Sequence, residues 1–243
     1  MLYHCLALLK NSFISSLGSE YDLVLVRPYI ECGVTHGKTD FLMSMYNKGS
    51  TSEDIDYLAS GLLIEILEHI GSKKLIIARI SFIGFSLGAL VIRAALWRPE
   101  FEAFLGNLHT FLSFGGPHMG LMCHSRNLFK TGLWLEQLFD KSVSVSQMAF
   151  TDHKDPRQTF LYKLSQKTGL EHFKNVILVS ALQDHIVPYH STRIEMCKAA
   201  LKGDEIGKGL TFKHMSTEWS TCTIEARANS PPAKTPTMPC TLL

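Results

Sequence analysis

A Gly-x-Ser-x-Gly run, from Gly84 to Gly88, separates an apolar stretch of strand character from an apolar stretch of helical character. Glycine two residues before and two after the serine tolerates the strained dihedrals and crowding of a very tight turn. The pattern is typical of a nucleophile elbow, in which Ser86 stands exposed at the start of a helix and attacks a carbonyl carbon. The backbone N–H of Leu87 would then point at the developing oxyanion. The same five residues also occur by chance in loops, but both flanks favour the elbow.

A serine nucleophile needs a base to accept its proton and an acid to orient that base. In elbow enzymes these residues follow in the chain order Ser, Asp or Glu, then His. Asp184 comes shortly after the apolar run 176–180, where an acid would lie at the carboxyl edge of a parallel sheet. The alternative is an ordinary turn aspartate before a helix. We predict that Asp184 is the acid.

Three histidines follow the predicted acid, namely His185, His190 and His214. The first two are too close to Asp184 in sequence to come from the next loop at a strand end. His214 lies at a feasible distance and is the candidate base, although only a short apolar run precedes it. His118 precedes the acid, which is the wrong order for the base, and is a candidate to line the cleft.

The elements needed to hold these residues alternate along the chain from about residue 39 to residue 200, which predicts an α/β fold with a mostly parallel sheet flanked by helices. We expect strands at 75–83, 108–114 and 176–180 and helices at 51–70, 87–97, 131–139, 157–167 and 191–201. The helix at 51–70 would begin with a capping box from Thr51, and the helix at 191–201 would be capped by Ser191. Residues 22–30 are ambiguous, because their composition favours a strand whereas Asp22 could begin a helix. Residues 1–20 are apolar but show no connection to this pattern.

Composition and charge narrow the class of protein. The 243 residues are 46% hydrophobic and 19% charged, as in an ordinary globular domain. The net charge of +2 does not indicate a basic surface of the kind that binds nucleic acid. Six scattered cysteines indicate neither a disulfide framework nor a zinc site, so we expect a cytoplasmic location, with no signal peptide and no membrane-spanning segment. Cys240 begins a C-terminal prenylation pattern, but little positive charge precedes it. No metal or organic cofactor is expected, because triad chemistry needs none.

Several segments closely resemble the lipase-like serine esterase domain at the C-terminal end of the "family with sequence similarity 135" proteins. They are 80–88, 108–113, 116–118, 155–164, 182–184 and 187–191. The resemblance covers about residues 21–202 and implies an α/β-hydrolase fold, with Ser86 as nucleophile and Asp184 as acid. It implies a serine ester hydrolase of cellular lipid metabolism, with an ester or lipid substrate and at most peripheral contact with a membrane. It also suggests that residues 22–30 form the first helix after the oxyanion loop.

The resemblance stops at both ends of the chain. Family members carry a strand ending in a Val-His-Gly-Leu-type motif that supplies the second oxyanion N–H, and residues 1–20 hold nothing like it. The family's later strands and catalytic histidine have no counterpart beyond Lys202. We therefore expect an atypical segment at 1–20, the esterase domain at 21–202 without early and terminal strands, and a disordered tail at 203–243, rich in Pro, Ser and Thr near its end. The alternative function is a catalytically inactive binding module or a truncated isoform.

Overall fold

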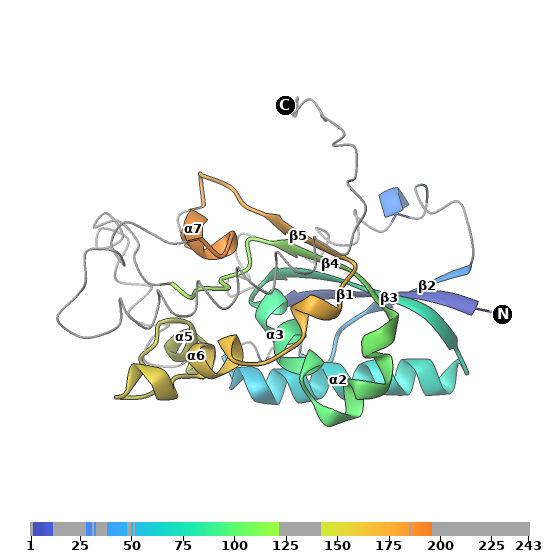
Figure 1. Cartoon of the computed structure of the whole chain (residues 1–243), viewed down its shortest axis with the longest axis horizontal. Helices are drawn as coiled ribbons and strands as arrows, with labels where there is room; N and C mark the ends of the chain where they lie inside the picture. The colour runs from blue at the N-terminus through green and yellow to red at the C-terminus, as the bar shows by residue number, and fades with distance from the viewer. Residues whose placement is uncertain are drawn as a thin grey trace.

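A five-stranded parallel sheet forms the centre of the structure, which is a computed structural model (Figure 1). It describes residues 2–11, 28–30, 32, 38–47, 50, 52–121, 142–184 and 186–195. The strand order is β2-β1-β3-β4-β5, with β1 at Leu2–Asn11, β2 at Lys38–Met43, β3 at Ile76–Ser86, β4 at Leu108–Phe114 and β5 at Asn175–Val179. Parallel neighbours need crossover connections, and helices lie along the chain between β2 and β3, between β3 and β4, and between β4 and β5. The predicted α/β fold with a parallel sheet is confirmed.

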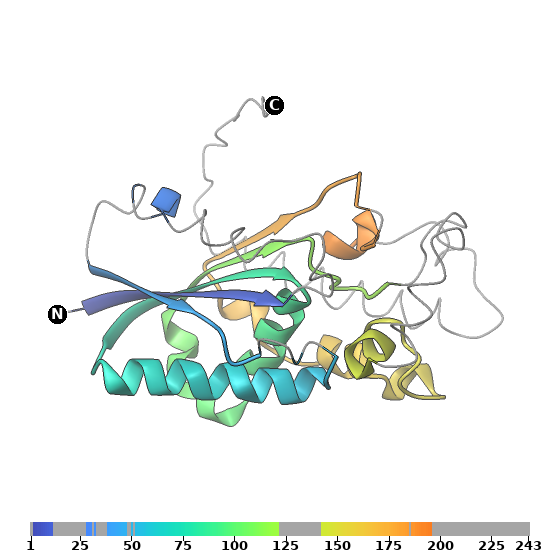
Figure 2. The same cartoon turned by 180° about the vertical axis from the view of Figure 1, so that it is seen from behind.

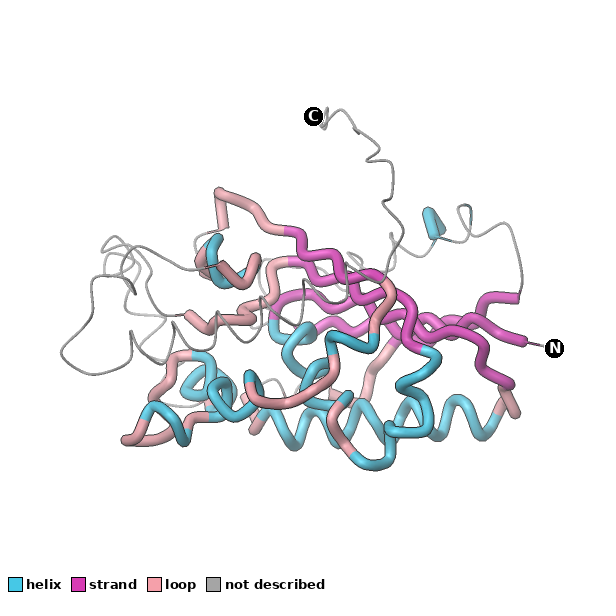
Figure 3. The backbone as a smooth tube through the Cα atoms, viewed as in Figure 1, coloured by secondary structure: helices cyan, strands magenta, loops and turns pink. Residues whose placement is uncertain are grey.

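The helices of the described residues are α2 at Ile55–Ser72, α3 at Leu87–Leu96, α5 at Val143–Met148, α6 at Phe160–Ser165 and α7 at Tyr189–Thr192. Three-residue or longer 3-10 segments lie at Pro99–Asn107, Pro156–Gln158 and Leu170–His172. Figures 1 and 2 show α2 and α3 along one face of the sheet, and Figure 3 shows the strands gathered in one layer beside them. No helix within these described ranges is both long enough and apolar enough to span a membrane.

Strand β1 corrects the sequence analysis, which left residues 1–20 unassigned and expected the early strand to be missing. It runs parallel between β2 and β3, with Leu8 opposite Met43 and Asn11 opposite Ser86. A central parallel strand reads as a continuous apolar run rather than as an alternation, so it gives no period-2 signal. The run from Leu2 to Leu9 is of this kind. The expected absence of terminal strands and the expected disordered tail at 203–243 concern residues outside those that the structure describes.

Two apolar clusters pack against the two faces of the sheet. The larger one joins the sheet to α2 and α3 and includes the fully buried Phe82, whereas Ile83 belongs to a smaller cluster with Phe114 and Ile30. Adjacent strand residues point to opposite faces, so Phe82 and Ile83 mark the two sides of β3. Residues 28–30 are helical, which favours a helix over a strand at the described end of the ambiguous segment 22–30.

Three predicted helices differ at their ends. Helix α2 begins at Ile55, because the Asp54 carboxylate, and not Thr51, caps it by accepting a hydrogen bond from the Asp56 N–H at 2.7 Å. The helix expected over 157–167 is divided at Thr159 into a 3-10 turn and α6.

The described part of the helix expected over 191–201 corresponds to α7. It starts after Pro188, whose ring fixes a backbone angle suited to the position before a helix, so Ser191 lies inside the helix rather than at its cap. Ile194 then has a φ of 58°, which departs from helical geometry. The helix expected at 131–139 lies outside the described residues.

Candidate active site

Ser86 occupies the turn that joins β3 to α3. Its backbone has a φ of 52° and a ψ of −126°, a conformation that residues other than glycine rarely adopt. Strain of this kind costs about 1–3 kcal/mol of the free energy of folding. Ser86 is formally the N-cap residue of α3, yet its side chain makes no capping hydrogen bond. A serine at this position ordinarily stabilises a helix through that bond. The turn therefore holds a strained serine whose hydroxyl does not serve the helix.

Small residues around Ser86 allow α3 to fold back over β3. A Cβ atom added at Gly84 would lie 2.7 Å from Ala89 Cα and 2.8 Å from Ala89 N. Gly88 is buried in the first turn of α3. The backbone N–H of Leu87 is the first of the helix, where N–H groups have no acceptor within the helix and carry its partial positive charge. This arrangement provides one N–H donor beside the serine.

The strand ends bring Ser86 and the predicted acid to the same edge of the sheet. Phe85 lies opposite Phe114, and Phe114 lies opposite Val179, so β3, β4 and β5 end in one row. Ser86 is one residue past this row on β3, and Asp184 follows β5 after a short turn. All the strands are parallel, so this is the carboxyl edge, where open α/β sheets bind ligands.

Asp184 is held by the backbone of its own loop. Its Oδ1 atom accepts hydrogen bonds from the N–H groups of Ile186 at 2.8 Å and Val187 at 3.0 Å. Its Oδ2 atom lies 3.6 Å from the position that a Cβ of Gly115 would occupy. Gly115, with a φ of 59°, follows β4 and donates to the Val179 carbonyl at 2.9 Å. The Asp184 carboxylate thus extends over the end of β4, in the direction of β3.

His118 lies in the core rather than on an open surface. It is completely buried, its Nε2 atom is 2.9 Å from Ser113 Oγ, and its ring meets the Phe111 ring at a centroid distance of 6.0 Å. Burial, reinforced by the positive charge of Arg93, holds the pKa of His118 well below its usual value, because both disfavour the imidazolium. His118 is therefore a neutral residue that contributes no accessible surface to a cleft.

Of the remaining candidate histidines, the structure describes only His190. His190 lies in α7 and is half-buried, whereas His185 and His214 lie outside the described residues. No three His, Cys, Asp or Glu side chains within the described ranges are grouped so that they could hold a metal ion. The sequence analysis missed Asn11, which ends β1 opposite Ser86. The signal that could have located this strand is the apolar run that precedes Asn11.

A parallel sheet flanked by helices, with a serine at a strand-to-helix turn on its carboxyl edge, defines an α/β-hydrolase-like fold. Residues 13–199 match the family described as "Putative serine esterase (DUF676)", which is most of the chain. The chain belongs to this family.

Proposed function

We propose that this protein is a serine carboxylic-ester hydrolase in which Ser86 is the nucleophile. The observation that carries the proposal is the Ser86 backbone, whose φ of 52° places a serine in strain without any capping hydrogen bond in return. Strain of this kind persists where the surrounding structure enforces it, and it clusters at active sites. Membership of the family described as "Putative serine esterase (DUF676)" supports the same assignment.

The reaction would proceed through an acyl-enzyme. Ser86 Oγ attacks the ester carbonyl carbon while a histidine accepts the hydroxyl proton, and the Leu87 N–H donates to the oxygen that becomes negative. The carbon–oxygen bond of the ester then breaks, and the alcohol leaves with the proton from the histidine. Water, deprotonated by the same histidine, attacks the acyl group and releases the acid and Ser86. Asp184 orients the histidine throughout.

His214 is the base that we propose, on the order Ser86, Asp184, His214 along the chain. The position of Asp184 supports this order of contacts. Its carboxylate extends over the end of β4 near Gly115, and neighbouring strands lie about 5 Å apart, so little more than one strand spacing separates it laterally from the β3 line. An imidazole could occupy the space between an acid over β4 and a serine at the end of β3.

A lipid ester is the substrate class that we propose. The resemblance to the "family with sequence similarity 135" domain supports it, and we propose that this chain is related to those proteins within its family. Two exposed apolar side chains beyond strand ends of the same sheet edge also support it, namely Met45 after β2 and Leu182 after β5, which are 57% and 76% exposed. Contact with a membrane would be peripheral.

A fluorophosphonate probe tests the nucleophile directly. Such a probe should label the wild-type protein and should not label Ser86→Ala, and hydrolysis of p-nitrophenyl butyrate should fall on the order of a million-fold in that variant. Ser60→Ala is a matched control, because Ser60 is also half-buried but donates to the Asp56 carbonyl within α2. It should label as the wild type does.

Failure of the wild type to react with the probe would contradict the proposal. In that case, binding of a fluorescent fatty acid that is unchanged by Ser86→Ala would indicate the alternative, a binding module without catalysis. His214→Ala should abolish labelling almost as completely as Ser86→Ala, since an unactivated hydroxyl is a poor nucleophile. Full labelling of that variant would assign the base elsewhere.

A further inference from the structure

Ser191 joins two loops at the carboxyl edge of the sheet. It lies in α7 and has no exposed surface. Its Oγ atom accepts a hydrogen bond from the Met119 N–H at 3.0 Å and donates one to the Gly120 carbonyl oxygen at 2.6 Å. Figure 1 shows α7 next to the segment that follows β4, as these bonds require. One buried hydroxyl therefore satisfies a donor and an acceptor of consecutive residues in the other loop.

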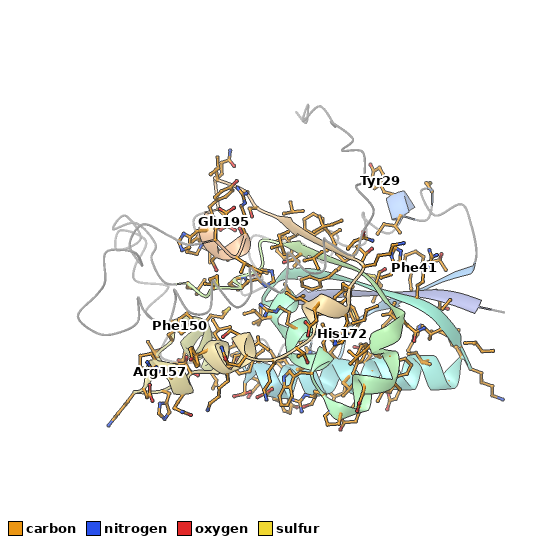
Figure 4. The ribbon with its side chains drawn as sticks, in the orientation of Figure 1. Tyr29, Phe41, Phe150, Arg157, His172 and Glu195 are labelled. Atoms are coloured by element: carbon orange, nitrogen blue, oxygen red, sulfur yellow. The ribbon has the colours of Figure 1, made fainter. Side chains whose placement is uncertain are left out.

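The loop that receives these bonds is firmly packed against the rest of the molecule. A Cβ at Gly116 would lie 2.8 Å from the Ala89 side chain in the first half of α3, and a Cβ at Gly120 would overlap the Met148 carbonyl oxygen. The Leu121 N–H donates to that same carbonyl oxygen at 2.8 Å. Met148 ends α5, close to Phe150, which is labelled in Figure 4. The loop after β4 is thus a fixed support between α3 and α5.

The Asp184 turn leads directly into α7. The N–H groups of Ile186 and Val187 donate to Asp184 Oδ1, and the Ser191 N–H donates to the Pro188 carbonyl at 2.8 Å. Val187 is itself buried, with 4% of its surface exposed. The carboxylate, the turn and α7 are therefore a continuous unit, and a displacement of α7 would carry Asp184 with it.

We propose that Ser191 is a positioning residue for Asp184. Its hydroxyl ties α7, and with it the Asp184 turn, to the fixed loop at Met119 and Gly120, which sets the distance of the carboxylate from Ser86. This inference rests on the proposed function, because it assumes that Asp184 is the acid. Removing the hydroxyl would leave the Met119 N–H and the Gly120 carbonyl buried without this partner, and the two loops would separate to admit water.

The first test compares two buried serines. Ser191→Ala should lower kcat for p-nitrophenyl butyrate about 10-fold to 100-fold, as expected when a catalytic group is displaced by up to about 1 Å, with KM changed less than about twofold. Ser165→Ala is the matched control. Ser165 is 5% exposed, donates to the Tyr162 carbonyl at 2.6 Å and accepts from Gln166 Nε2 at 3.2 Å, but it lies in α6. An equal loss of kcat in both variants would overturn the proposal.

The second test asks whether Ser191 acts through Asp184. In an Asp184→Asn background, Ser191→Ala should cause no further fall in the rate of fluorophosphonate labelling, whereas two independent effects would multiply. A full further loss would overturn the proposal. Ser191→Cys, which keeps the size of the side chain but weakens both hydrogen bonds, extends the comparison if Ser191→Ala does not fold: partial loss of rate is expected, and a wild-type rate would overturn the proposal.

The two proposals fail in different ways. A wild-type protein that the probe does not label refutes the hydrolase itself, and the role of Ser191 with it. A wild-type protein that is labelled, together with a folded Ser191→Ala variant that is labelled equally fast, refutes only the positioning role. Urea unfolding of each variant, at the temperature of the assay, establishes which variants are folded.

Discussion

Gly84→Ala should destabilise the protein and slow its reaction at Ser86. The added Cβ would lie 2.7 Å from Ala89 Cα, 2.8 Å from Ala89 N and 2.9 Å from Ile92 Cδ1. The isoleucine methyl group can rotate away, but the first two atoms belong to the backbone of α3. The substitution can be accommodated only if the start of α3 moves away from β3.

The size of that movement follows from the contacts. Ordinary contact of a Cβ begins at 3.4 Å, so the start of α3 must move by about 0.7 Å. Overpacking of a filled core costs about 1–3 kcal/mol of the free energy of unfolding. Ser86 and the Leu87 N–H lie between Gly84 and Ala89 and must move with the helix. A displacement approaching 1 Å at reacting groups lowers rates by up to about 100-fold, so we expect at least a tenfold fall in labelling rate.

Gly71→Ala supplies the matched control. Gly71 lies within α2 and a Cβ there would have no atom within 4 Å, so the substitution should stabilise the protein by about 0.5–1 kcal/mol through helix propensity. Urea unfolding and fluorophosphonate labelling of both variants measure the two effects. If the free energies of unfolding of the two variants agree within about 0.5 kcal/mol, or if Gly84→Ala is labelled at the wild-type rate, the packing argument at the turn is refuted.

Three further substitutions test other parts of the structure. Gly120→Ala should cost about 2–5 kcal/mol in urea unfolding, because Gly120 has a φ of 74° and a Cβ would overlap the Met148 carbonyl; a loss as small as that of a surface substitution would contradict this geometry. Burial keeps His118 neutral in the native state, whereas the unfolded chain binds a proton below about pH 6.5. Its contribution therefore destabilises the protein as the pH falls below 6.5, by at most about 1.4 kcal/mol per pH unit, and His118→Gln should flatten the measured dependence on pH; an unchanged slope would refute the assignment. Gln147→Ala should cost about 1–3 kcal/mol in thermal or urea unfolding, since Gln147 Oε1 accepts from the buried Ile55 N–H at 2.9 Å, and a neutral result would show that another acceptor replaces it.

Local patterns predicted the turn at Ser86 and the elements next to it. The glycines at 84 and 88 indicate a tight turn, which is a steric requirement of a few neighbouring residues, and the apolar spacing of α2 indicates its buried face. Both signals can be recognised without knowledge of the rest of the chain. β1 could not be recognised, because a central parallel strand carries no alternation and its register comes only from its neighbours β2 and β3.

The residues around Asp184 show a different limit of the sequence. The sequence marked Asp184 by its place after a strand, which a parallel sheet converts into a position at the carboxyl edge. It marked Ser191 only as a helix cap. The hydroxyl of Ser191 instead bonds to Met119 and Gly120, about seventy residues earlier in the chain, and no local pattern encodes a partner at that separation.

The sequence by itself determined the fold class, the strained turn at Ser86 and the membership of the family described as "Putative serine esterase (DUF676)", because these depend on short-range sterics and on motifs carried in contiguous residues. Only the tertiary structure decided that β1 lies beside β3, that His118 is enclosed against Phe111, and that the Asp184 turn is tied to the loop after β4. Each of these depends on packing between segments that are distant in sequence, where burial and register are properties of the whole fold.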